Sequence, residues 1–153
     1  MKRPSFRLIC AILAGVGIGL SMPAFAQVEP PHRKPGMWEQ SIQLPGDRVM
    51  TMQMCIDEET EKEYSAMGKK MADCTQEFHK IPGGYSFKGT CHGKTATGTA
   101  IGDFDKAIKV EVDSEGTHMT SNLNYLGPCP AGRKPGDLVM PGGRVVNMKD
   151  MPH

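Results

Sequence analysis

The sequence predicts a mainly β domain: an antiparallel meander of about seven strands, strongly curved or barrel-like, with one short helix after the second strand. Apolar and polar residues alternate over several short segments, and Gly, Pro and Asp separate these segments. The connections are short, so each strand should run antiparallel to the one before it. Four cysteines remain in the mature chain once Cys10 is set aside, an even number that favours a disulfide framework.

Residues 1–26 have the features of a signal peptide. A basic start precedes an apolar run at 8–20, and Ala24-Phe25-Ala26 fits a small-x-small cleavage site. The apolar run is shorter than the roughly 20 residues that span a bilayer. We therefore expect an exported, periplasmic protein that is cleaved after Ala26 and has no membrane span in its mature chain.

The rest of the 153-residue chain is long enough for one domain. Three of its 18 basic residues are lost with the signal peptide, which leaves 15 against 17 acidic residues and a net charge of −2. Nothing in that balance indicates a nucleic-acid partner. Prolines make residues 27–35 an extended N-terminal arm, and residues 36–153 are expected to form a single disulfide-linked β domain.

The first predicted hairpin precedes the helix. Residues 38–44 alternate apolar with polar, and if residues 45–47 are the loop, positions whose numbers sum to 92 pair, so that Trp38 faces Met54. Asp57 can cap the helix that follows, because its carboxylate can accept hydrogen bonds from the first free backbone amides. The three glutamates soon after it suit the positive end of the helix dipole. Tyr64, Met67 and Met71 recur at helical spacing and form its narrow apolar stripe.

The stretch 74–91 predicts a second hairpin, with Pro82-Gly83 at its turn. Positions whose numbers sum to 165 then pair, so Phe78 faces Phe87 and Cys74 faces Cys91. That register predicts a disulfide across the hairpin. If it forms, Cys55 is left to bond Cys129.

Three further strands are predicted at 95–101, 106–113 and 117–126. A Cys55–Cys129 bond would bring the end of the last of these strands to the end of the second strand of the chain. This favours a strongly curved sheet, possibly closed into a barrel, over a flat one.

Several motifs in the same order resemble the bacterial exported family catalogued as domain of unknown function 3617. They are Arg33-Lys34-Pro35-Gly36-Met37-Trp38-Glu39, the four cysteines, Gly98-Thr99 leading to Gly102-Asp103-Phe104-Asp105, Leu126-Gly127-Pro128-Cys129, and Pro135-Gly136-Asp137 with Met140-Pro141-Gly142. The resemblance implies a periplasmic, methionine-rich domain that includes the Pro/Gly-rich tail from 131 to 153. It carries no activity and no catalytic residues.

Soft-metal binding is one candidate function. Met50, Met52 and Met54 alternate along a strand, and thioethers select Cu(I). An imidazole such as that of His118, His79 or His92 could complete the set. The alternative interpretation is that these methionines fill an irregular core against Trp38 and Ile42, as their flexibility allows.

A non-catalytic binding or envelope-associated module is the leading interpretation. The chain shows no nucleophile-elbow, zinc-protease, phosphate-loop or dinucleotide signature and no Cys-x-x-Cys spacing, so we expect no enzyme activity. A curved antiparallel sheet can present an apolar pocket to a small ligand or an edge strand to an envelope protein. The candidate residues for the lining of such a pocket are Trp38, Phe78, Phe87, Tyr85 and Tyr125, for which a role in the core is the alternative.

Overall fold

The structure is a computed structural model that describes residues 28–29, 31–44, 46–63 and 74–151. The predicted signal peptide and the predicted helical stripe of Tyr64, Met67 and Met71 lie outside the described residues. No helix within the described part of the chain is long and apolar enough to cross a membrane.

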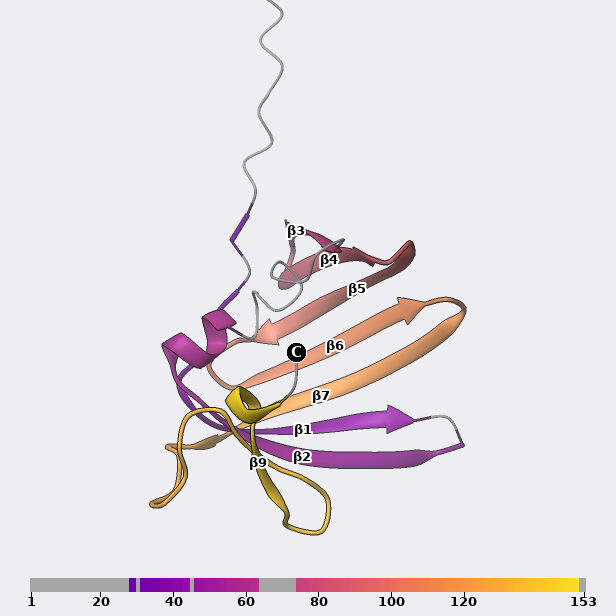
Figure 1. Ribbon diagram of the computed structural model, residues 1–153. Coiled ribbons are helices and arrows are strands. Elements are labelled where there is room, and N and C mark those ends of the chain that lie inside the picture. Colours follow the sequence, from indigo (N-terminus) through magenta and orange to yellow (C-terminus); the bar gives the residue numbers. More distant parts are fainter. Residues whose placement is uncertain (1–27, 30, 45, 64–73, 152–153) are drawn as a thin grey trace, which may run out of the picture.

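One antiparallel sheet accounts for all the strands of the described chain (Figure 1). The strands are β1 (Gly36–Leu44), β2 (Arg48–Ile56), β3 (Cys74–Ile81), β4 (Gly84–Cys91), β5 (Lys94–Asp103), β6 (Ala107–Ser114), β7 (Thr117–Gly127), β8 (Asp137–Val139) and β9 (Val145–Asn147), followed by a 3-10 turn, η1 (Met148–Asp150). Their order in the sheet is β3-β4-β5-β6-β7-β1-β2-β8-β9. Residues 58–63, between β2 and β3, are helical.

The predicted class, a mainly β antiparallel domain with a helix after the second strand, is confirmed, but two details are wrong. The sheet has nine strands rather than seven, because the Pro/Gly-rich tail adds β8 and β9, each of three residues and too short to show alternation. The sheet is also open and not strongly curled, rather than strongly curved or closed into a barrel, with β3 and β9 at its two edges. The Cys55–Cys129 bond does join the ends of β2 and β7, but β1 pairs with both strands and lies between them.

Both predicted hairpin registers are present in the structure. Trp38 pairs with Met54 across β1 and β2, and Phe78 pairs with Phe87 across β3 and β4. Cys74 lies opposite Cys91 and is bonded to it. Gly83 has a φ of 77°, which a glycine adopts without the steric cost that other residues meet at this turn position.

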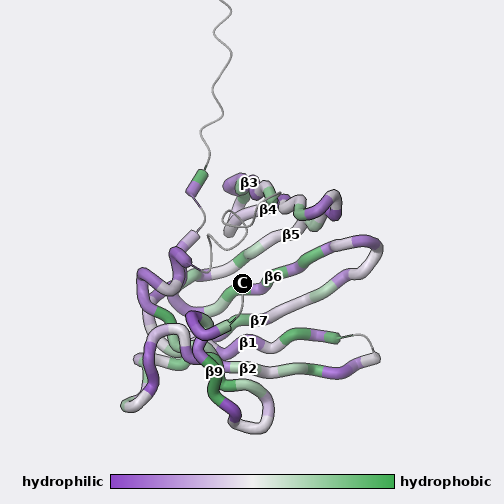
Figure 2. Tube along the Cα trace, in the orientation of Figure 1, coloured by the Kyte–Doolittle hydropathy of each residue, from purple (hydrophilic) through white to green (hydrophobic). Residues whose placement is uncertain are grey.

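The sheet has an apolar and a polar face. Side chains alternate between the two faces along each strand, and residues that pair directly across neighbouring strands point to the same face. We call the side that carries Trp38 the inner face and the opposite side the outer face. The core lies on the inner face and comprises Trp38, Met54, Ile56, Ile108, Leu123 and Leu138. In Figure 2, apolar and polar residues alternate along several of the long strands, as this arrangement requires.

Hydrogen bonds attach the N-terminal arm and the C-terminal tail to the sheet. The Lys34 amide donates to the Phe104 carbonyl (3.0 Å), and the Trp38 indole donates to the Lys34 carbonyl (2.8 Å). In the tail, the Gly136 amide donates to the Cys55 carbonyl (2.8 Å), and β8 pairs with β2. The contacts of the domain therefore begin before Gly36 and include the tail.

Candidate functional site

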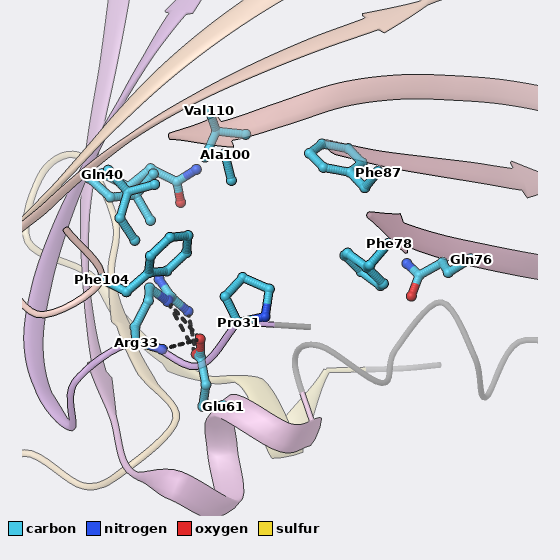
Figure 3. A pocket seen from close by; sticks show the side chains of 12 residues that line it. Pro31, Arg33, Gln40, Glu61, Gln76, Phe78, Phe87, Ala100, Phe104 and Val110 are labelled. Atoms are coloured by element: carbon cyan, nitrogen blue, oxygen red, sulfur yellow. Dashed lines mark hydrogen bonds and ion pairs between the residues drawn. The ribbon is translucent and has the colours of Figure 1, made fainter. Parts of the chain in front are cut away.

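A cavity of about 270 Å³ lies against the inner face (Figure 3). Six strands, the N-terminal arm, the helix and the β5–β6 turn contribute to it. The lining residues are Pro31, Arg33, Gln40, Glu61, Gln76, Phe78, Phe87, Ala100, Phe104, Ile108, Val110 and Leu123. Its size is close to the lower end of the range of small-molecule sites, roughly 300–1,000 Å³.

Most of the lining is apolar. The rings of Phe78 and Phe87, opposite each other on β3 and β4, are tilted at 44° with centroids 6.4 Å apart. Phe104, in the turn after β5, meets Tyr85 edge-on at 5.8 Å. Ala100 leaves space between these rings because its side chain is a single methyl group. The cavity thus offers aromatic and aliphatic surface to a ligand.

A buried ion pair lies at one end of the cavity, between the arm and the helix. Arg33 Nη2 donates to Glu61 Oε2 at 2.7 Å, and Arg33 Nε donates to Oε1 at 3.0 Å and to Oε2 at 3.2 Å. The two side chains are only 6% and 5% exposed. The guanidinium also lies 5.9 Å from the centroid of the Trp38 ring. This geometry satisfies both charges and fixes the arm against the helix.

The cap at the start of the helix fixes the position of Glu61, which makes this contact. Asp57 Oδ1 accepts a hydrogen bond from the Thr60 amide at 2.8 Å, as the predicted cap requires. The contact with Thr60, whose backbone amide donates to the carboxylate, holds the pKa of Asp57 below its ordinary value of 3.8. Glu61 follows in the first turn, with its amide bonded to the Asp57 carbonyl at 2.9 Å.

Two glutamines bring polar groups to the apolar lining. Gln40 Nε2 donates to Ser121 Oγ at 2.9 Å, so one of its donors is used within the protein. Gln76 Oε1, by contrast, is buried and has no hydrogen-bond partner among the residues that the structure describes. Buried polar atoms are paired in the great majority of cases, so an unpaired acceptor in a cavity wall is a group that a ligand could satisfy.

Of the five predicted pocket residues, two line the cavity, and Tyr85 lies outside its lining, edge-on to Phe104. Phe78 and Phe87 line the cavity. Trp38, which is 1% exposed, and Tyr125 instead pack against each other beside it, with ring centroids 5.5 Å apart. The Arg33–Glu61 pair was not predicted as part of a site. The one sequence signal near it was the run of motif residues that begins at Arg33.

The predicted metal ligands do not come together as a set. Met50, Met52 and Met54 share the inner face of β2, but Met54 is 3% exposed and packs in the core with Trp38. His118 does not lie with them, because its register on β7 places it on the outer face, where its Nδ1 lies 2.8 Å from Asp113 Oδ1. Within the described ranges, no three His, Cys, Asp or Glu side chains are grouped as a metal site.

A family model, described as "Protein of unknown function (DUF3617)", matches residues 33–129. This range is more than half of the chain and includes both disulfides and every cavity-lining residue except Pro31. Searches of the curated proteins and of the solved structures found no match.

Proposed function

The chain belongs to the DUF3617 family, and we propose that it is an exported, periplasmic binding module that holds a small, mainly apolar ligand in the inner-face cavity. The observation that carries this proposal is the combination of an apolar lining with the unpaired acceptor of Gln76. An apolar wall with a few convergent polar groups is typical of small-molecule sites.

Export is supported by two features of the chain. The first 26 residues have the charge and hydropathy pattern of a signal peptide. Both cysteine pairs are bonded, and disulfides persist in oxidising compartments such as the periplasm.

The proposal is for binding rather than catalysis because of how the charged groups are arranged. Glu61 is the one carboxylate among the described lining residues, and Arg33 engages both of its oxygens. A general base must be able to reach a substrate proton, and an activated nucleophile needs an adjacent base. Glu61 is better explained as a structural anchor of the arm.

A dye-binding experiment with two matched variants tests the proposal. An environment-sensitive apolar dye should bind the native, oxidised protein with saturation. Ala100→Phe places a ring in the cavity and should weaken dye binding by at least about tenfold, which corresponds to 1.4 kcal/mol. Thr99→Phe adds the same ring one residue away on the outer face, where Thr99 pairs with Ser86, and should leave the affinity unchanged.

The proposal fails if the dye signal appears only on unfolding, or if Ala100→Phe and Thr99→Phe weaken binding equally. Urea unfolding of both variants shows whether each one is still folded under the binding conditions.

Cu(I) handling is the alternative function, and one observation favours it. Met50 and Met52 lie two positions apart on the inner face, are only partly buried, and do not belong to the core cluster that includes Met54. Titration of the oxidised protein with Cu(I) tests this alternative. Tight binding that is lost in the Met50→Ala/Met52→Ala variant would support it, and no binding would remove it.

A further inference from the structure

A second cavity, of about 510 Å³, adjoins the first on the inner face. Gln76, Phe78 and Phe87 line both cavities, so the two cavities meet at these residues, and we call them together the trough. From these shared residues the second cavity extends along β4 and β5 to the turn that joins them, where His92 and Lys94 line it.

Small residues on β5 form the floor of this trough. The inner-face positions of β5 between Lys94 and Phe104 are Ala96, Gly98, Ala100 and Gly102. Of these four residues, Ala100 lines the first cavity and Ala96 lines the second, and at roughly 3.4 Å per residue the two lie about 14 Å apart. The Phe87 ring packs over Gly98 between them, since a Cβ on Gly98 would lie 2.5 Å from Phe87 Cζ. The two cavities therefore follow one another along β5 on either side of this ring, an arrangement that suits a linear chain.

The two ends of the trough differ in polarity. At the first end the buried charges of Arg33 and Glu61 satisfy each other, and the walls are aromatic and aliphatic. At the other end Lys94 pairs with Glu115 at 3.1 Å, and both side chains are largely exposed (69% and 55%). Exposed ion pairs are weak, so Lys94 can exchange this contact for a carboxylate of a ligand. The unpaired oxygen of Gln76 lies between the two ends.

We propose that the ligand is an acidic single-chain amphiphile. Its acyl chain lies in the first cavity, a hydroxyl or amide donor of its head group pairs with Gln76 Oε1, and its carboxylate lies near Lys94 and His92. This inference rests on the proposed function and adds the chemical class of the ligand. Apolar burial supplies the attraction along the chain, and the polar groups set its direction.

Competition against the apolar dye tests the class with three probes that share one chain length: dodecanol, laurate and N-lauroylglycine. Laurate should bind at least roughly threefold more tightly than dodecanol because of its carboxylate, and N-lauroylglycine more tightly than laurate because its amide N–H can donate. In the Lys94→Gln/His92→Gln variant, laurate should fall to the affinity of dodecanol. In Gln76→Leu, the advantage of N-lauroylglycine over laurate should disappear.

A matched pair of variants tests the position of the head group. Ala96→Phe fills the second cavity and should weaken laurate by at least about tenfold, whereas Thr97→Phe, on the outer face of the same strand, should not. Equal binding of laurate and dodecanol, or a laurate preference that survives Lys94→Gln/His92→Gln, would overturn the ligand class. If Ala100→Phe nevertheless abolished dye binding, the first cavity would remain supported as a binding site.

Anionic phospholipid vesicles distinguish a free amphiphile from a lipid surface. The proposal expects the protein to stay in solution when such vesicles are sedimented, and laurate to remain a competitor of the dye. Co-sedimentation that is unaffected by Ala96→Phe would mean that the protein binds the lipid surface elsewhere, and it would overturn the proposal.

Discussion

Replacement of Glu61 by Gln tests whether the Arg33–Glu61 pair anchors the arm beside the cavity. The substitution keeps the size of the side chain but removes its charge, while the guanidinium stays in a site where it is 6% exposed. Three side-chain hydrogen bonds, of 2.7, 3.0 and 3.2 Å, lose their ionised acceptor. Because removal of the ionised partner of a buried charge is strongly destabilising, we expect the free energy of unfolding to fall by about 3–5 kcal/mol.

The assay is urea unfolding of the oxidised protein, with the free energy obtained by linear extrapolation. Lys109→Ala is the control, since it breaks a pair with Glu111 whose side chains are 55% and 39% exposed and should cost no more than about 1 kcal/mol. Arg33→Met/Glu61→Leu removes both charges and should cost less than Glu61→Gln alone. If Glu61→Gln costs no more than Lys109→Ala, the pair does not hold the arm and the account of this end of the cavity is wrong.

Two further predictions concern the cross-links and the helix cap. In the loop-entropy model, replacing Cys55 and Cys129 (74 apart) by Ala should cost about 4–5 kcal/mol, and replacing Cys74 and Cys91 (17 apart) about 3 kcal/mol. Urea unfolding of both variants checks this order, which a larger loss for the short loop would contradict. Since the pKa of Asp57 is lowered on folding, its contribution to stability should be present above pH 3.8 and fade as the pH falls through the folded pKa. The difference in stability between the native protein and Asp57→Ala should therefore shrink in acid, and a difference that stays constant would refute the assigned cause.

Local patterns were enough to predict the hairpins and the cross-strand bond. A short turn determines which residues lie opposite each other, so locating Pro82-Gly83 also located Cys74 opposite Cys91. The same alternation bears on the histidine that we proposed as a metal ligand. Met119 points to the inner face, so its neighbour His118 points to the outer face, away from the three methionines.

Long-range arrangements could not be predicted in this way. The pairing of β1 with β7 joins segments about 80 residues apart in the chain, and alternation states only which face a residue occupies, not which strand lies beside it. Arg33 and Glu61 are 28 residues apart and are residue types that are usually exposed. Their burial depends on how the arm and the helix meet over the sheet, for which the sequence holds no local signal.

The trough also suggests why this small domain carries two disulfides. Gly98 and Gly102 lie within β5, where a glycine weakens a strand by roughly 0.5–1 kcal/mol relative to alanine. A bulkier residue at Gly98 is excluded by Phe87 and by the Glu111 carbonyl, so the packing of Phe87 against β5 requires this glycine. Each cross-link is worth about 3 kcal/mol or more in the loop-entropy model, which exceeds the cost of both glycines. An interior that contains cavities is therefore compatible with a stable fold, provided that both bonds remain oxidised.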